Sequence, residues 1–347
     1  MTTRRGFLSS LGVVALTAAG CGAPAARTVR GETMGTYFKV VLTDELDNAD
    51  MAHISSAVQQ ELGRLTLRIS AYDSNAELAQ LNAAKPGVWQ PVGKSINTLV
   101  EQCRQLANAS DGAFDATVGP LVELWGFGTS AHHSMRVPEG HAIDAAKALT
   151  RFSAFDIDLA KGRATRLHPD ARLDVDGIGK GYGVDTITHM LDRLGLGNFL
   201  VEIGGEVRTR GERADGGDWQ IGVAHPQGGT PTAQLNLADK AIATSGDYLQ
   251  FFEVDGQRYS HLLDPRSGYP IDGNVTSVTV VADDAMTADA LSTGLAVMGL
   301  RAGLAFAEQH RISAYFLYRE DSAIHARHTT TFDATSTRIQ SRRPEAV

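Results

Sequence analysis

An Asp-Gly dipeptide at residues 255–256 constrains the fold of this chain more than any other feature. It joins two runs, residues 248–254 and 258–263, in which apolar and polar side chains alternate. Asp-Gly adopts the left-handed backbone conformations that a two-residue turn requires. The stretch therefore predicts a β-hairpin whose two strands lie side by side along their whole length.

The second strand of this hairpin ends in polar residues that a bare hairpin does not need. His261 and Asp264-Pro265-Arg266 occupy its exit, and a Gly-Tyr-Pro turn follows. Side chains of these types shuttle protons, accept hydrogen bonds and bind phosphate. The alternative is a surface hairpin with a solvated polar end, and the hairpin alone does not decide between the two.

The first 20 residues read as an export signal rather than as part of the fold. Arg4-Arg5-Gly6-Phe7-Leu8 resembles a twin-arginine signal, and the apolar run that follows, residues 11–19, is too short to span a bilayer. The sequence Ala18-Ala19-Gly20-Cys21 is similar to a bacterial lipoprotein cleavage site, after which Cys21 carries the lipid. The alternative is an ordinary signal peptide cut nearby.

This interpretation divides the chain into a signal (residues 1–20), a tether (21–30), one catalytic domain (31–335) and a flexible tail (336–347). It places the protein on the periplasmic side of the bacterial inner membrane, anchored through Cys21. Acylation of Cys21 would leave Cys103 without a disulfide partner, so a large core must supply the stability. The formal net charge of −8 gives no basic footprint, so no nucleic-acid partner is expected.

Two segments rich in glycine and polar residues interrupt the regular pattern. Residues 111–128 mix Gly, Pro and aromatic residues too densely for a regular element, which predicts a long ordered loop. Residues 172–185 predict a strand that delivers two acids, Asp174 and Asp176, into a glycine-rich turn and then a helix. Gly-x-Gly-Lys-Gly at such a junction can offer N–H groups and a Lys to phosphate. Its spacing fits neither a Walker A loop nor a dinucleotide fingerprint.

The remaining pattern predicts an α+β fold. Apolar residues at helical spacing mark a helix over residues 51–69, and further helices are expected over 141–150, from about 285, and over 301–309. Closely spaced strands between residues 199 and 282, and again over 313–318 and 323–328, favour a mixed, largely antiparallel sheet rather than βαβ repeats. The helices should pack on this sheet, in two lobes with a boundary within residues 151–173.

Asp289 and Thr293 stand four residues apart on a predicted helix, so their side chains share one face. A carboxylate, a hydroxyl and a backbone carbonyl are hard oxygen ligands of the kind that Mg²⁺ takes together with water and phosphate. The alternative is structural: Asp289 near a helix start and Thr293 bonded back within its helix.

Fragments spread over residues 31–309 resemble the family of FAD:protein FMN transferases, also called ApbE proteins. Each fragment is weak alone, but their order and distances are specific. They are Gly-Ala-Phe-Asp-Ala-Thr-Val-Gly-Pro-Leu, Trp-Gly-Phe-Gly, Gly-Ile-Gly-Lys-Gly-Tyr, Val-Glu-Ile-Gly-Gly-Glu, Ala-Thr-Ser-Gly-Asp-Tyr, Tyr-Ser-His-Leu-Leu-Asp-Pro-Arg-Ser-Gly-Tyr-Pro and Ala-Asp-Ala-Leu-Ser-Thr.

The resemblance implies a reaction, a substrate and partners. FAD is cleaved at its pyrophosphate, FMN is joined through its phosphate to a Thr or Ser hydroxyl of an acceptor flavoprotein, and AMP leaves. The acceptor would be a subunit of an extracytoplasmic redox complex. Such a phosphoryl transfer needs in-line positioning, charge neutralisation and a base. FAD would lie between the two lobes.

The resemblance also implies site residues, each against a core or capping alternative. Mg²⁺ would be held by Asp289, Thr293 and the carbonyl of Gly179, a position where many relatives have Ala. His261 would be the base, Lys180 would assist at the phosphates, Asp264 would orient His261 or contact the nucleotide, and Arg266 would contact phosphate or acceptor. The residues implied in flavin binding are Met34, Tyr72, Ala113, Phe114, Asp115, Asp176, Lys180, Tyr182, His261 and Leu263.

Two other functions share these residues. A metal-dependent FAD pyrophosphatase would release FMN and AMP into water from the same site. A non-catalytic lipoprotein would bind flavin without turnover. The joint presence of Asp289, Thr293 and His261 favours an enzyme.

Overall fold

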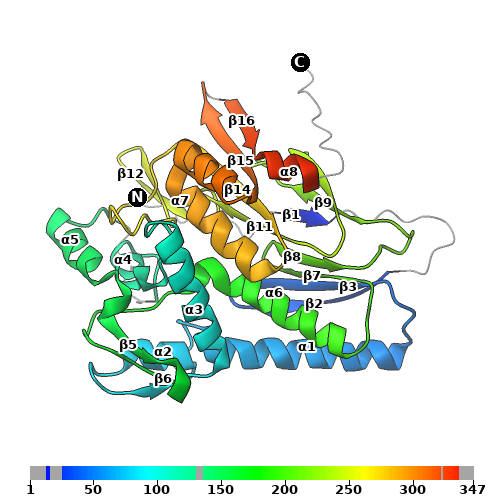
Figure 1. Ribbon diagram of the computed structural model, residues 1–347, viewed down its shortest axis with the longest axis horizontal. Coiled ribbons are helices and arrows are strands. Elements are labelled where there is room, and N and C mark those ends of the chain that lie inside the picture. Colours follow the sequence, from blue (N-terminus) through cyan, green and yellow to red (C-terminus); the bar gives the residue numbers. More distant parts are fainter. Residues whose placement is uncertain (1–12, 16–25, 130–135, 322, 336–347) are drawn as a thin grey trace.

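The computed structural model describes residues 13–15, 26–129, 136–321 and 323–335 of the chain. Its centre is an eight-stranded sheet in the order β16-β15-β14-β11-β8-β7-β3-β2 (Figure 1). Every strand pair in it is antiparallel. These strands are β2 (Arg27–Thr33), β3 (Thr36–Leu42), β7 (Phe199–Ile203), β8 (Glu206–Arg210), β11 (Ala241–Gly246), β14 (Val275–Ala282), β15 (Ser313–Glu320) and β16 (Ala323–His328).

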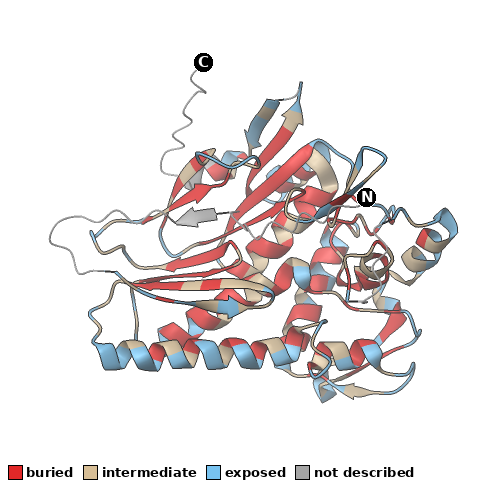
Figure 2. Ribbon diagram, turned by 180° about the vertical axis from the view of Figure 1, so that it is seen from behind, coloured by how far each residue is buried: buried red, intermediate tan, exposed pale blue. Residues whose placement is uncertain are grey.

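Three long helices cover one face of this sheet, namely α1 (Asn48–Ile69), α6 (Asp176–Arg193) and α7 (Ala285–Gln309) (Figure 1). Helices α1 and α6 pack apolar side chains on β3 and β7, and α7 packs on β11, β14 and β15. Figure 2 shows the outcome for α1: its outer side is exposed and its inner side is buried. The opposite face of the sheet is covered by β9 (Trp219–Val223), β10 (Ala233–Leu237) and α8 (Thr330–Thr335).

A second lobe, with its own core, joins the end of α1 to the start of α6. It contains α2 (Glu77–Ala83), α3 (Lys94–Ala109) and a small sheet of β4 (Gln90–Pro91), β6 (Arg163–Arg166) and β5 (Phe155–Asp158). Helices α4 (Gly119–Leu124) and α5 (Gly140–Leu149) pack with the hairpin of β12 (Phe251–Val254) and β13 (Gln257–Ser260) around Trp125. The α+β fold with a largely antiparallel sheet is thus confirmed.

The predicted hairpin forms as expected around its turn. Asp255 and Gly256 have φ angles of 52° and 80°, and Val254 pairs with Gln257. The strands are shorter than the alternating runs, because residues 248–250 form a turn and His261 follows the last paired residue.

Two predictions about irregular segments are wrong. Residues 171–175 form no strand, and the glycines expected in a turn over 177–183 lie inside helix α6. Residues 119–124, expected in a long loop, form helix α4, with Pro120 in its first turn where it costs no hydrogen bond. The physical reason for the helical glycines is close packing, described below.

Helix α7 was expected as two helices and is indeed broken. Gly299 has φ 76° and ψ 175°, which no L-residue adopts in a helix. By length and composition α7 could cross a membrane, but it packs against the sheet and carries buried Asp289.

Most of the predicted export signal lies outside the described residues. Within the signal, β1 (Val13–Ala15) pairs with β9. The division of the chain into signal, tether, domain and tail stays a prediction.

Candidate functional site

Glycine allows α6 and α7 to pack in direct backbone contact. A Cβ atom on Gly181 would lie 2.2 Å from the carbonyl oxygen of Ala285 and 2.8 Å from Cβ of Asp289. The N–H of Gly181 donates to Asp289 Oδ2 over 2.9 Å. The glycine-rich motif therefore acts through close helix packing, which brings the start of α6 to the carboxylate of Asp289.

The first turn of α7 is fixed by two carboxylates. Asp284 is the N-cap and accepts from the N–H of Thr287. Asp185, on α6, accepts from the N–H groups of Ala285 and Met286 over 2.9 Å each, and its other neighbour is the Arg208 guanidinium. These bonds satisfy N–H groups that a helix start leaves without intrahelical partners. They hold Asp289, one turn further on, in a fixed position.

Lys180 lies between two buried acids. Its Nζ is 3.4 Å from Glu206 Oε1 and 3.8 Å from Asp289 Oδ1, and it donates to the carbonyl of Asp176 over 3.4 Å. Burial acts to lower the pKa of Lys180, but the charges of Asp289 and Glu206 outweigh it and raise that pKa. Burial also raises the pKa of Glu206 and of Asp289. Lys180 therefore stays positively charged. Its single charge faces two carboxylates, those of Glu206 and Asp289.

The donor atoms around Asp289 fit a hard divalent cation. Two buried carboxylates face one ammonium, and Glu206 Oε2 has no hydrogen-bond partner among the described residues. The hydroxyl of Thr293, one turn from Asp289 on α7, adds a neutral oxygen. All these donors are oxygens, as Mg²⁺ prefers. No group of three or more His, Cys, Asp or Glu side chains in the described chain forms a metal site, so an ion here would also need hydroxyl, carbonyl, water or phosphate oxygens.

The structure places Gly179, the third predicted ligand, in the first turn of α6. Its N–H donates to the carbonyl of Val175 over 2.7 Å, and its Cα side faces Ile69. The sequence predicted that a glycine-rich turn would present the Gly179 carbonyl, but Gly179 lies within a helix. Its role as a ligand stays a prediction.

His261 is held as a neutral base at the end of β13. Its backbone N–H donates to the Gln250 carbonyl over 3.1 Å, and its Nδ1 lies 3.0 Å from the same oxygen. A carbonyl only accepts, so Nδ1 carries the proton and Nε2 keeps its lone pair. Burial, with the charge of Lys180, lowers the pKa of His261 to about 4. The ring also contacts Phe127 edge-on, with 6.3 Å between centroids.

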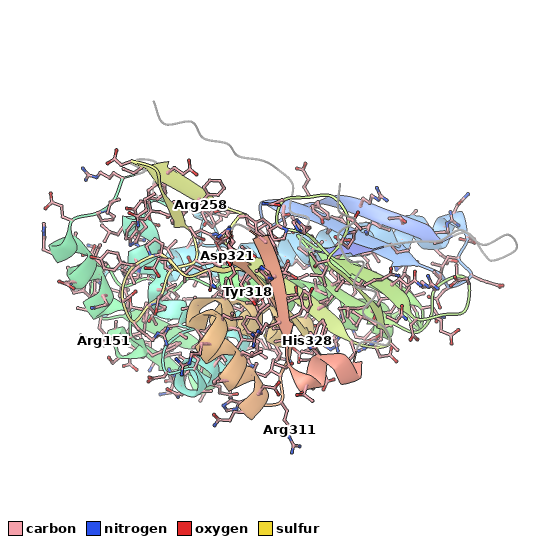
Figure 3. The ribbon with its side chains drawn as sticks, turned by 90° about the horizontal axis from the view of Figure 1, so that it is seen from above. Arg151, Arg258, Arg311, Tyr318, Asp321 and His328 are labelled. Carbon is pink, nitrogen blue, oxygen red and sulfur yellow. The ribbon has the colours of Figure 1, made fainter. Side chains whose placement is uncertain are left out.

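In the structure the Gln250 carbonyl, and not Asp264, lies at His261 Nδ1, and a contact of Asp264 with the nucleotide stays a prediction. Asp264 forms a two-pronged pair with Arg266, in which Nε and Nη2 each donate over 2.9 Å. Such a fork satisfies both partners at once. Asp264 therefore fixes Arg266 and shapes the turn after the hairpin. Arg258 lies on the hairpin of β12 and β13 (Figure 3). Its guanidinium carbon lies 3.5 Å from the centroid of the Phe251 ring.

Two cavities are each lined by a residue implied in flavin binding, and none of the residues that line them belongs to α6 or α7. One, of about 320 Å³, is lined by Tyr72 and Asp174, and the other, of about 330 Å³, by Met34 and Asp73. Tyr72 is 56% exposed and donates to Asp176 Oδ2 over 3.1 Å, so one face of its ring is free to stack. Burial and the charge of Asp176 raise the pKa of Asp174 to about 7.

The other implied flavin residues have structural partners. Phe114 and Leu263 are buried in the two cores of the second lobe, and Tyr182 packs partly buried against the first of these cores. Ala113 is buried as well. Asp115 accepts from the N–H and the hydroxyl of Thr117, as a cap does. Their part in flavin binding stays a prediction, because a packing role accounts for each contact.

Sequence reasoning missed three residues of the site: Glu206, Ser245 and Ser292. Glu206 follows Gly204-Gly205 at the start of β8, whose first four residues are buried. The Ser245 hydroxyl oxygen lies 2.8 Å from the Ser292 hydroxyl oxygen and 2.9 Å from the Thr293 hydroxyl oxygen. Ser245 and Ser292, like Glu206, lie within the fragments that carry the family resemblance, and this was the available signal.

Known proteins resemble this chain over most of its length. The family model described as the ApbE family matches residues 34–316. The FAD:protein FMN transferase of Vibrio cholerae serotype O1 is 37% identical over 306 residues, covering 87% of this chain and 91% of that protein. The enzyme of the same name from Salmonella typhimurium is 32% identical over 301 residues, covering 86% and 85%.

Solved structures agree with the sequence comparisons. The apo crystal structure of Pseudomonas stutzeri flavinyl transferase ApbE superposes with a TM-score of 0.83 at 36% identity, covering 92% of this chain and 99% of that one. The Vibrio cholerae flavin transferase ApbE superposes with a TM-score of 0.81 at 34% identity, covering 90% and 100%.

Proposed function

The chain belongs to the ApbE family, and we propose that it uses Mg²⁺ to move FMN from FAD to a Thr or Ser hydroxyl of an acceptor protein, releasing AMP. Curated relatives named FAD:protein FMN transferase support a transferase that carries flavin from FAD to a protein. The finer statements, on AMP and on the hydroxyl, come from the family resemblance, and the oxygen donors around Asp289 support the statement on Mg²⁺.

The observation that carries the proposal is the junction of α6 and α7. It sets the Asp289 carboxylate within 3.8 Å of the Lys180 ammonium and within hydrogen-bond distance of the Gly181 N–H. Asp289 and Thr293 would hold Mg²⁺, which supplies positive charge to phosphate oxygens during the transfer. Lys180 brings a second, permanent positive charge to the same phosphates.

His261 would take the proton of the acceptor hydroxyl. In the transfer, the acceptor oxygen forms a bond to the FMN phosphorus while the bond from that phosphorus to the AMP oxygen breaks. The proton of the hydroxyl passes to His261 Nε2, whose lone pair is kept free by the bond from Nδ1 to the Gln250 carbonyl. AMP leaves with the bonding electron pair.

The partner and location follow from the N-terminal sequence and the family, and they belong to the proposal. The acceptor is a flavoprotein subunit of an extracytoplasmic redox complex. The enzyme works at the periplasmic side of the inner membrane, held there by a lipid on Cys21 after export. The location is supported by Arg4-Arg5 and by the residues around Cys21, and the acceptor by the family resemblance alone.

A gel assay tests the proposal. The full chain is incubated with FAD, an acceptor flavoprotein domain and either Mg²⁺ or EDTA, and the denatured acceptor is examined for flavin fluorescence. We expect a fluorescent acceptor band with Mg²⁺, none with EDTA, and none when the acceptor Thr is replaced by Val. A fluorescent band of equal intensity in EDTA would refute the Mg²⁺ dependence.

The two alternative functions predict different products in the same reactions. A pyrophosphatase would release free FMN and AMP with or without an acceptor. A flavin carrier would bind FAD without forming AMP.

A further inference from the structure

Three hydroxyl groups form a chain between β11 and α7. Ser245 Oγ lies 2.8 Å from Ser292 Oγ and 2.9 Å from Thr293 Oγ1. Ser292 Oγ also lies 2.9 Å from the backbone carbonyl oxygen of Asp289. The chain thus begins at Thr293 and ends at the main chain of the residue that carries the site carboxylate.

The number of protons available fixes the donor and the acceptor in each of these hydrogen bonds. A carbonyl oxygen only accepts, so the Ser292 hydroxyl must donate to Asp289. Each hydroxyl has one proton, so Ser292 can only accept from Ser245, and Ser245 can in turn only accept from Thr293. The Thr293 proton therefore points at Ser245, and the remaining lone-pair side of Thr293 Oγ1 is left for a ligand.

The surroundings keep the chain in this state. Ser292 is fully buried and Ser245 is 8% exposed, so water does not compete for their hydrogen bonds. Ser245 sits on β11, which pairs on both sides with β8 and β14, and Ser292 sits on α7 above it. Neither element can shift without breaking the packing of α7 on the sheet.

We propose that Ser245 and Ser292 are positioning residues that orient the Thr293 hydroxyl, so that its oxygen meets a divalent cation with a lone pair and never with its proton. The inference rests on the Mg²⁺ site of the proposed function. It adds two residues that touch neither cation nor substrate. Partners of this kind affect metal affinity by about 10- to 100-fold in metalloproteins.

The test measures cation binding without turnover. Mn²⁺ serves as the probe in the absence of FAD, and its binding to the full chain is followed by the loss of the free-ion EPR signal. We expect Ser292→Ala to weaken Mn²⁺ binding about 10-fold, because Ser245 can then donate to Thr293 and turn the Thr293 proton toward the site. Ser245→Ala, which removes the acceptor for that proton, should weaken it similarly.

A matched control comes from β11 and its neighbouring strand β14. Thr244 and Thr279 share a buried hydroxyl bond of 2.8 Å, and residue 244 faces the opposite side of β11 from Ser245. Thr279→Val removes a buried hydroxyl bond without touching the hydroxyl groups of Thr293, Ser245 and Ser292. It should lower the melting temperature as the serine variants do, yet leave Mn²⁺ binding within 2-fold of the wild-type value, on the order of assay error.

The outcomes separate this inference from the proposed function. Mn²⁺ binding by the wild type that is lost in Asp289→Ala and unchanged in both serine variants would overturn the positioning role and leave the metal site standing. A wild type that binds no Mn²⁺ would overturn both. Equal weakening by Thr279→Val and the serine variants would assign the effect to stability and overturn the positioning role.

Discussion

The backbone N–H of Gly181 on α6 donates a 2.9 Å hydrogen bond to the Asp289 carboxylate on α7. The bond is possible because Gly181 has no side chain where α7 crosses it. Through this contact, one glycine sets the distance between the Lys180 ammonium and the carboxylate expected to hold Mg²⁺. The distance between the Lys180 ammonium and the Asp289 carboxylate therefore depends on how closely α6 and α7 pack.

Gly181→Ala should disrupt both the fold and the site. The new Cβ would lie 2.2 Å from the Ala285 carbonyl oxygen, so the helices must move apart. Overpacking of this kind costs about 1–3 kcal/mol or more. Urea denaturation should show that loss, and Mn²⁺ binding should weaken with it. Gly63→Ala is the control: a Cβ on Gly63, within α1, meets nothing within 4 Å, and about 0.5–1 kcal/mol of stability should be gained.

Asp185→Asn should weaken the start of α7. Asp185 is buried, pairs with Arg208, and accepts from two N–H groups of α7, so removing its charge leaves the buried guanidinium unpaired. We expect a loss of about 3 kcal/mol in the free energy of unfolding. Asp192→Asn, on the same helix, removes a partly exposed carboxylate 3.5 Å from Arg210 and should cost no more than about 1 kcal/mol. Equal losses in the two variants would contradict a special role for Asp185.

Glu206→Gln should change how stability depends on pH. Burial raises the pKa of Glu206 from 4.5 to about 8. Between these values the folded chain binds the proton more tightly than the unfolded chain, so the contribution of Glu206 to stability falls as pH rises. Melting temperatures in EDTA from pH 5 to pH 8 should therefore fall less steeply for Glu206→Gln than for the wild type. Parallel curves would show that Glu206 does not titrate in this interval.

His261 should stay neutral in mildly acidic solution. Its pKa falls from 6.5 to about 4, chiefly by burial. The unfolded chain then binds the proton more tightly than the folded one, so the stability that His261 contributes is lost as pH falls through this interval. Proton NMR titration should show its ring signal, assigned by its loss in His261→Gln, unchanged down to pH 5. A midpoint near 6.5 would contradict the burial effect. His261→Gln should also abolish transfer while leaving FAD binding nearly unchanged.

Local sequence signals predicted those elements that local chemistry determines. The hairpin follows from Asp255-Gly256, because few other residues accept positive φ at both turn positions. Helix α1 follows from apolar spacing along residues 51–69, with its true start set three residues earlier by the capping box of Asp47 and Asp50. The prediction that Asp289 and Thr293 share one face of a helix required only the prediction of the helix.

The rest depended on partners distant in sequence. The glycines at 177–183 fit a turn or a close helix contact equally well from sequence, and for Gly181 the position of Ala285 decides between them. Asp264 stands near both His261 and Arg266 in sequence, and the fold pairs it with Arg266. Glu206 acquires its role from Lys180, which lies on another element. A sequence reading alone cannot rank such contacts.

The central claim is that FMN passes from FAD to a protein hydroxyl, and one measurement tests it directly. The full chain is mixed with FAD, Mg²⁺ and an excess of acceptor flavoprotein, and AMP is quantified while the intact acceptor mass is recorded. We predict one AMP for each acceptor that gains the mass of FMN less water, with both products lost in Asp289→Ala. AMP and free FMN formed without any change in acceptor mass would contradict the claim.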